Sequence, residues 1–134
     1  MGDYLDYLES KRIVEYHHNK GEKVVLARGT FDIFHLGHLD FLERAKDLGN
    51  ILIVNVNNDL WVKEHKSEDL PVRPEKNRAV LVSRQESVDY SFIHPSHDIH
   101  PAISLAILCR PDIIVREDKD LEFQELERSI LLKT

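Results

Sequence analysis

The chain has 134 residues and a formal net charge of −6 at pH 7, with a pI of about 5.7. This length suits one compact domain with a real core, and the acidity argues against a general nucleic-acid-binding protein. The single cysteine, Cys109, lies in an apolar run typical of a buried thiol, and it excludes an internal disulfide and a Cys-rich zinc site.

No targeting or membrane segment is expected. The first residues, MGDYLDYLESKR, are too polar for a secretory signal, and no apolar run reaches the roughly 18 residues that a membrane-spanning helix needs. The sequence therefore predicts a cytoplasmic protein with no membrane partner.

The first half of the chain shows helices and strands in alternation. Apolar residues among charges predict a helix over residues 3–19, which Gly21 would end. KVVLA (23–27) and ILIVNV (51–56) are apolar throughout, as strands of a buried parallel sheet are. Between them, apolar residues at helical spacing predict a second helix over residues 38–49.

The second half continues this alternation. Polar residues and prolines predict a loop over residues 57–73, and Pro74 is expected at the first position of a helix over residues 75–85. A strand is expected over residues 88–93. The remaining expected elements are a helix, a strand and a helix, over residues 102–109, 112–115 and 121–132.

Strands that are apolar throughout and alternate with helices imply a parallel sheet with helices on both faces, which is the α/β class. The chain has no internal repeat, no low-complexity segment and no linker that divides it, so one domain is expected over residues 1–134. In open α/β sheets ligands bind at the carboxyl ends of the strands, near a switch in strand order.

The stretch GTFDIFHLGH (29–38) joins the first predicted strand to the next helix. Gly29 permits a sharp turn or a close approach to a ligand, and Gly37 lets the start of the helix approach a phosphate. His35 and His38 are three residues apart, share one face of the first helical turn, and each has an N–H to offer a phosphate oxygen. The free N–H groups of the helix start make the same place an anion site.

The histidine pair has two other interpretations. The histidines are ordinary polar residues of a helix start, or they ligate a metal ion. Zinc needs three or four protein ligands, and only Asp32 or Asp40 stands close enough in the sequence to join the pair. We therefore expect no metal site here.

Two further features have no single interpretation. HPSHDIHP (94–101) follows a predicted strand at the ligand-binding end, so metal binding, substrate contact and a simple proline-bounded loop are all open. Trp61 either stacks on a nucleotide base or covers the surrounding loop.

GTFDIFHLGH resembles the signature G-x-F-D-x-x-H-x-G-H of the cytidylyltransferase-like nucleotidyltransferases. The resemblance continues through RAKDLGNILIVNVNND, VKEHKSEDLPVRPEKNRAVLV, SVDY and PDIIV, and it covers residues 23–117. The most similar branches are the bacterial heptose-phosphate adenylyltransferase domain and glycerol-3-phosphate cytidylyltransferase. The resemblance implies a nucleotidyltransferase domain with an N-terminal helical extension (1–21) and a Rossmann-like open parallel sheet (22–134) whose nucleotide site lies at the carboxyl ends of the strands.

The resemblance also implies site residues. His35 and His38 would contact the nucleotide phosphates and stabilise the transition state, while Asp32 would organise the turn. The residues expected in catalysis are His35, His38, Lys66 and Arg78. The residues expected to bind the nucleotide are Gly29, Thr30, Phe31, Asp32, Gly37 and Lys63.

The family reaction is attack by a phosphate monoester on the α-phosphorus of a nucleoside triphosphate, with release of pyrophosphate. The nucleophile is already an anion, so cations and N–H donors that position the substrates and offset their charge can supply the catalysis. The resemblance implies ATP or CTP as one substrate, a small phosphomonoester (sugar phosphate or glycerol phosphate) as the other, Mg²⁺ with the triphosphate, and a homodimer. ATP and a sugar phosphate are favoured, because the stretch from NND to NRAVLV is most similar to the heptose enzymes.

Two departures from the family pattern suggest an alternative function. VREDKD stands where relatives have V-K-G-G-D, so Glu117 and Asp118 replace glycines, and no Ser/Thr-rich segment follows. The alternative is a catalytically impaired nucleotide-binding or regulatory module that lacks the C-terminal phosphate-binding segment. A fragment of a class I aminoacyl-tRNA synthetase, which shares the His-x-Gly-His turn, is disfavoured because no second synthetase motif is present.

Overall fold

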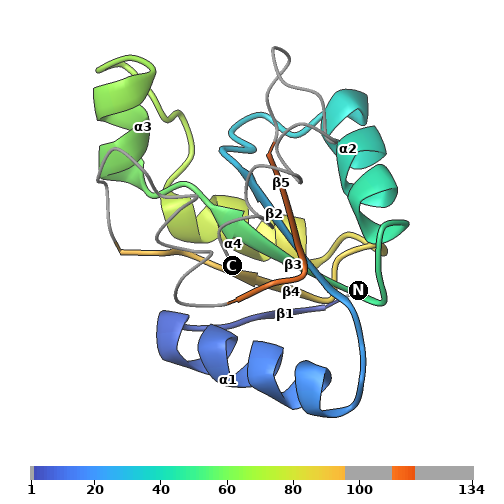
Figure 1. Ribbon diagram of the computed structural model, residues 1–134. Helices are drawn as coiled ribbons and strands as arrows, with labels where there is room; N and C mark the ends of the chain where they lie inside the picture. Colours follow the sequence, from blue (N-terminus) through green and yellow to red (C-terminus); the bar gives the residue numbers. More distant parts are fainter. Residues whose placement is uncertain (1, 96–109, 117–134) are drawn as a thin grey trace.

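The structure, a computed structural model, describes residues 2–95 and 110–116. Five parallel strands form one sheet in the order β1-β4-β3-β2-β5 (Figure 1). The strands are β1 (Asp3–Tyr4), β2 (Val24–Gly29), β3 (Ile51–Val56), β4 (Tyr90–Phe92) and β5 (Ile113–Arg116). The helices are α1 (Tyr7–Asn19), α2 (Leu36–Lys46), α3 (Asp59–His65) and α4 (Glu75–Ser83).

Helices cover both faces of the sheet. Successive strand residues point to opposite faces, so each face has its own buried cluster. Val25 of β2 shares one buried cluster with Phe41 of α2 and Val82 of α4. Leu26 of β2 faces the other way and shares a second cluster with Val14 of α1. Figure 1 shows α1 on the opposite side of the sheet from α2. The predicted α/β fold, with helices on both faces of a parallel sheet, is confirmed.

The carboxyl end of β2 lies at a switch in strand order. From β2 the chain passes through α2 to β3 on one side, whereas β5 pairs with β2 on the other side. Gly29, the last residue of β2, lies beside Val56, the last residue of β3. Ligands of open α/β folds bind in the crevice at such a point, which is where the predicted turn lies.

The prediction of one helix over residues 3–19, within a helical extension over residues 1–21, is wrong at its start. Asp3–Tyr4 form β1 and pair in parallel with β4, so the N-terminal segment supplies an edge strand of the sheet. A capping box explains where the helix begins. The Asp6 side chain accepts the backbone N–H of Glu9 at 2.8 Å, and the Glu9 side chain accepts that of Asp6 at 3.2 Å.

The prediction of a loop over residues 57–73 is wrong in its first half. α3 occupies Asp59–His65, and Asn58 caps it by accepting the backbone N–H of Trp61 at 2.7 Å. Asparagine is among the preferred residues at this position, so the signal was present in the sequence. Pro74 is the N-cap of α4 rather than its first residue.

Several predictions lie outside the described residues. They concern the helices over residues 102–109 and 121–132, most of the segment over residues 94–101, and the acidic residues Glu117 and Asp118. In the described part, no helix is long and apolar enough to cross a membrane.

Candidate active site at the carboxyl ends of the strands

The paired histidines form the N-terminal cap of α2. His35 is the N-cap residue, and its Nδ1 accepts the backbone N–H of Gly37 at 3.0 Å. His38 lies three residues later, and its Nδ1 accepts the backbone N–H of His35 at 3.1 Å. The two imidazoles thus form the reciprocal capping arrangement that Ser/Thr and Glu/Gln form elsewhere.

This capping fixes the orientation of both rings. Because each Nδ1 accepts a hydrogen bond from a backbone N–H, the neutral rings of His35 and His38 carry their own protons on Nε2. The rings stack with their centroids 3.9 Å apart and an interplanar angle of 26°. Capping engages Nδ1 alone, so it is compatible with the predicted donation from Nε2 to a phosphate at the positive end of α2.

Because Gly37 has no side chain, the His35 ring can pack directly against its backbone. A Cβ at Gly37 would lie 2.8 Å from His35 Cε1 and 3.0 Å from His35 Nδ1. Such distances are too short for carbon and nitrogen atoms that are not bonded, so any side chain at Gly37 displaces the imidazole. The glycine therefore acts through close packing of the histidine, rather than through an unusual backbone conformation.

The left-handed backbone of this turn falls on Phe31, whose φ is +51°, and not on Gly29. A bulky residue rarely adopts this conformation, which costs about 1–3 kcal/mol. Phe31 is buried, with its ring against His38 and Phe41. Of the two roles predicted for Gly29, the sharp turn is not observed: Gly29 ends β2, and its carbonyl accepts the backbone N–H of Asn57 at 2.8 Å. The close approach to a ligand stays a prediction.

Asn57, directly after β3, connects the ends of β2 and β3. Its Nδ2 donates to Thr30 Oγ1 at 3.0 Å, and its Oδ1 accepts from Arg28 Nε at 3.2 Å. Asn57 and Thr30 are both buried. Asn57 was not among the predicted site residues, although an asparagine that directly follows an apolar strand was a usable signal.

Arg78 is fully buried and joins three segments of this edge. Its Nη1 donates to the carbonyls of Thr30 at 2.9 Å and Asn57 at 2.7 Å. Its Nε donates to the carbonyl of Arg73 at 2.9 Å, and its Nη2 forms an ion pair with Asp59 Oδ1 at 2.7 Å. Arg78 thus links these three segments inside the protein through its hydrogen bonds. The predicted contact between Arg78 and a phosphate stays a prediction.

Asp32 holds the segment that precedes α4 against the turn formed by residues 29–38, which we call the histidine turn. Its Oδ2 accepts the backbone N–H of Val72 at 2.8 Å, and its Oδ1 accepts that of Arg73 at 2.9 Å. This geometry agrees with the interpretation that Asp32 organises the turn. Direct contact between Asp32 and the nucleotide stays a prediction.

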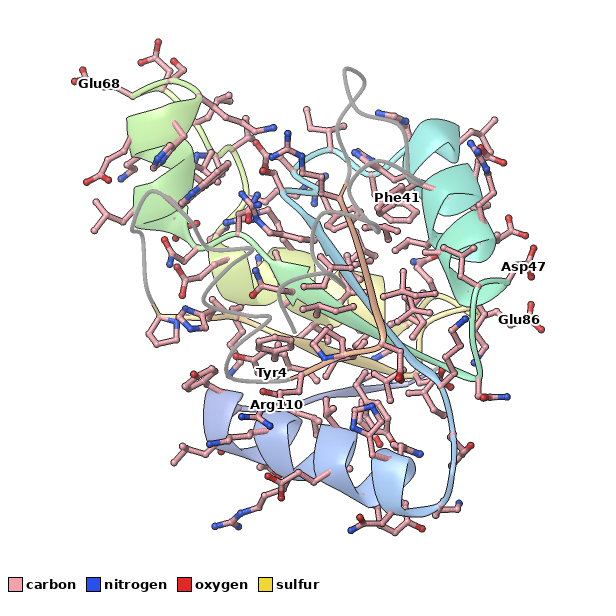
Figure 2. All side chains as sticks on the ribbon, in the orientation of Figure 1. Tyr4, Phe41, Asp47, Glu68, Glu86 and Arg110 are labelled. Atoms are coloured by element: carbon pink, nitrogen blue, oxygen red, sulfur yellow. The ribbon has the colours of Figure 1, made fainter. Side chains whose placement is uncertain are left out.

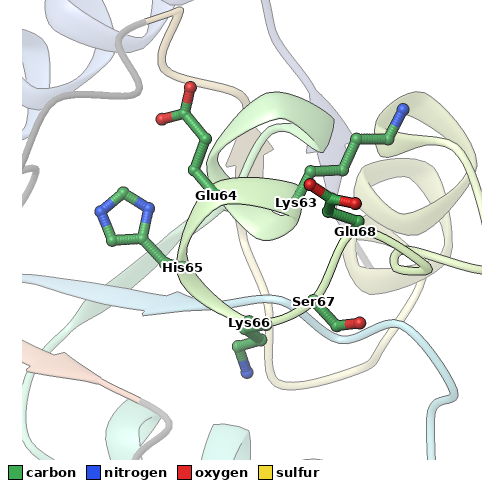
Figure 3. Close-up of a pocket in the computed structure, with 6 residues that line it drawn as sticks. All are labelled: Lys63, Glu64, His65, Lys66, Ser67 and Glu68. Atoms are coloured by element: carbon green, nitrogen blue, oxygen red, sulfur yellow. The ribbon is translucent and has the colours of Figure 1, made fainter.

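The two predicted lysines lie on the opposite side of the strand ends from α2. Figure 2 shows Glu68, just after α3, and Phe41 of α2 on opposite sides of this edge. A hollow of about 660 Å³ at the end of α3 is lined by Lys63, Glu64, His65, Lys66, Ser67 and Glu68 (Figure 3). Lys66 leaves the backbone on the opposite side from Lys63 in this view. Within residues 2–95 and 110–116, no hydrogen bond or ion pair joins Lys63 or Lys66 to the histidine turn.

Trp61 packs between protein groups. Its ring stacks on His65, with centroids 4.6 Å apart and an angle of 11°, and the Arg28 guanidinium lies 5.0 Å from its centroid. These contacts favour the interpretation that Trp61 covers the surrounding protein over the interpretation that it stacks on a base, which stays a prediction.

Comparison with known proteins decides the family. A model of cytidylyltransferase-like proteins matches residues 26–132, which is most of the chain. The chain belongs to the cytidylyltransferase-like family of nucleotidyltransferases. The family resemblance of the GTFDIFHLGH signature is confirmed, and the match continues past residue 117 to residue 132.

Individual relatives agree with this family. The chain is 40% identical over 111 residues to the bifunctional protein HldE of Nitratiruptor sp., and 39% identical over 108 residues to that of Salmonella arizonae. These matches cover 83% and 81% of this chain but 23% and 22% of the relatives. The chain therefore spans about a quarter of the length of these relatives.

A solved structure supports the fold. The crystal structure of the lipopolysaccharide core biosynthesis protein from Thermoplasma volcanium aligns with a TM-score of 0.68 and 32% sequence identity. The alignment covers 82% of this chain and 87% of that protein.

Proposed function

We propose that this nucleotidyltransferase transfers a nucleoside monophosphate from ATP, in preference to CTP, to a sugar phosphate or glycerol phosphate, and releases pyrophosphate. The observation that carries the proposal is the stacked pair His35 and His38 at the N-terminus of α2, with both Nδ1 atoms held by backbone N–H groups. Such a pair presents Nε2–H donors at the positive end of a helix, beside the switch in strand order.

The reaction depends on stabilising negative charge more than on proton transfer. An oxygen of the acceptor phosphate forms a new bond to the α-phosphorus, and the bond between the α-phosphorus and the bridging oxygen of pyrophosphate breaks. Negative charge builds on the leaving group, where donors from His35, His38 and the N–H groups of the first turn of α2 would stabilise it. Because the acceptor phosphate is already an anion, no residue of the chain has to act as a general base.

Mg²⁺ would accompany the triphosphate. Among the described residues, no group of three or more His, Cys, Asp or Glu side chains forms a metal site, and both oxygens of Asp32 accept backbone N–H groups. These residues fit a cation that is held chiefly by substrate phosphates, as Mg²⁺ commonly is. When bound there, the ion would neutralise part of the triphosphate charge.

The relatives support the choice of acceptor. The Thermoplasma volcanium protein is described as acting in lipopolysaccharide core biosynthesis, and this favours a phosphorylated sugar over other phosphomonoesters. The bifunctional relatives are about four times longer, so any second activity that they have is not assigned to this chain.

The test is pyrophosphate release with Mg²⁺, either ATP or CTP, and a panel of phosphomonoesters that includes aldose 1-phosphates and glycerol 3-phosphate. We expect release to depend on one nucleotide and one acceptor, and to fall about a hundredfold or more in His35→Ala. No release with any pair, in a protein that ATP or CTP still stabilises against heat, would instead support the nucleotide-binding module.

Location and assembly belong to the same proposal. An enzyme that uses a nucleoside triphosphate is expected in the cytoplasm, and the family resemblance implies a homodimer. Light scattering of the purified protein at micromolar concentration tests the dimer directly.

A further inference from the structure

The backbone of Arg73 is held from both sides. Its N–H donates to Asp32 Oδ1 at 2.9 Å, and its carbonyl accepts from Arg78 Nε at 2.9 Å. The preceding N–H, of Val72, donates to Asp32 Oδ2 at 2.8 Å, and the following residue, Pro74, restricts the backbone of Arg73 to extended conformations.

The side chain of Arg73 has no such partner. Arg73 is exposed, and within the part of the chain that the structure describes, no hydrogen bond or ion pair engages its guanidinium. Two nearby carboxylates accept hydrogen bonds from backbone groups instead. Asp32 accepts the N–H groups of Val72 and Arg73, and Glu75 Oε1 accepts the backbone N–H of Asp59 at 2.9 Å.

The hydrogen bond to Asp32 places the backbone of Arg73 beside the histidine turn. Asp32, which holds Arg73, is three residues before His35 in the same turn. Lys66, by contrast, has no hydrogen bond or ion pair with this turn among the described residues. The arginine fork matches two oxygens of a phosphate, and a backbone that is ordered before binding reduces the entropy lost when the ligand binds.

We propose that Arg73 is a phosphate-binding residue of this site, and that it contacts either the triphosphate or the phosphate of the acceptor. This inference rests on the proposed nucleotidyl transfer, because it assigns a residue to the same pair of substrates. Asp32 and Arg78 are then the positioning residues that hold Arg73 at the site.

The test compares Arg73→Ala and Arg73→Lys with Arg84→Ala. Arg84 is also exposed, and it lies at the other end of α4, so it is a matched control for the loss of one surface arginine. We would measure the Kd of ATP alone, the Kd of inorganic phosphate, the KM of each substrate, and the melting temperature. Arg73→Ala is expected to weaken one of the two substrates at least about tenfold with little change in melting temperature, and Arg73→Lys is expected to recover only part of that loss.

The Kd of ATP and the KM of the acceptor together identify which substrate carries the phosphate that Arg73 contacts. A weaker Kd for ATP assigns Arg73 to the triphosphate, whereas a higher KM for the acceptor with an unchanged Kd for ATP assigns it to the acceptor. If Arg73→Ala matches Arg84→Ala in every binding and kinetic constant, the inference is wrong. If the wild-type protein binds ATP but turns over no substrate pair, the proposed function fails. The effect of Arg73→Ala on the Kd of ATP and of inorganic phosphate then decides the role of Arg73 by itself.

Discussion

The Nδ1 atom of His38 accepts the backbone N–H of His35 at 3.1 Å, and the two rings stack 3.9 Å apart. One residue of the pair therefore orients the backbone of the other. Both roles that the sequence allowed, a helix cap and a phosphate-binding pair, are compatible because they use different ring nitrogens. The cap orients the rings before any ligand arrives, and such preorganisation lowers the cost of stabilising charge in a transition state.

The two roles of His35 can be separated by substitution with asparagine. His35→Asn keeps an oxygen that can cap α2, because asparagine is a preferred N-cap residue, but removes the imidazole Nε2–H. We expect the free energy of unfolding to change by less than about 0.5 kcal/mol and turnover to fall about a hundredfold. Urea unfolding and pyrophosphate release measure the two effects. Unfolding at much lower urea with unchanged specific activity would assign His35 to capping alone.

The fully buried Arg78 is expected to be essential for stability. Arg78→Met removes donors from the carbonyls of Thr30 and Asn57 and leaves Asp59 without its partner. The loss should be about 3 kcal/mol or more, which corresponds to a fall of roughly 10 °C in melting temperature for a chain of this size. Calorimetry checks the value, with Lys76→Met on the exposed side of α4 as the control. A melting temperature equal to that of the control would show that the hydrogen bonds of Arg78 do not stabilise the fold.

Elements with regular patterns were predictable from the sequence. ILIVNV is β3 over the predicted residues, because a strand buried on both faces is apolar at nearly every position. α3 was missed because Asp59–His65 is short and mostly polar, so only its N-cap, Asn58, marks it. β1 was missed because a strand of two residues has no periodicity, and its pairing with β4 is a long-range contact.

At the candidate site, the residue types were predictable from the sequence but their contacts were not. The glycine–histidine signature identified the turn and both histidines. The burial of Arg78 and the two hydrogen bonds that Asp32 accepts from residues 40 and 41 positions later depend on tertiary packing, which no local pattern encodes. Asn57 belongs to the same class, because its partners Thr30 and Arg28 lie on another strand end.

Gly37 should be more important for activity than for folding. A Cβ at this position would lie 2.8 Å from His35 Cε1, so Gly37→Ala displaces the imidazole. Alanine favours helix over glycine by up to about 1 kcal/mol, and this offsets part of the cost of the displaced cap. We expect turnover to fall at least about tenfold while the melting temperature stays within a few degrees of wild type. Wild-type turnover in Gly37→Ala would mean that the observed position of the His35 ring is not needed.

The contact between His17 and Glu22 predicts how stability depends on pH. His17 Nδ1 lies 2.9 Å from Glu22 Oε1, and His17 Nε2 lies 2.9 Å from the Tyr90 hydroxyl. The hydrogen bond from His17 lowers the pKa of Glu22 from its ordinary value of 4.5. A carboxyl group with a lowered pKa in the folded state stabilises the fold above its unfolded pKa, and this contribution is lost as pH falls through the folded value.

The variant Glu22→Gln, compared with wild type by urea unfolding from pH 7 to pH 3, measures this contribution. We expect the wild-type advantage to be constant from pH 7 to about pH 5, and to shrink below the ordinary value of 4.5. Asp47→Asn, at the exposed end of α2, serves as the control for the loss of one surface carboxylate. An advantage that grows as pH falls has the wrong sign for a lowered pKa, and it would show that the hydrogen bond does not favour the ionised form of Glu22.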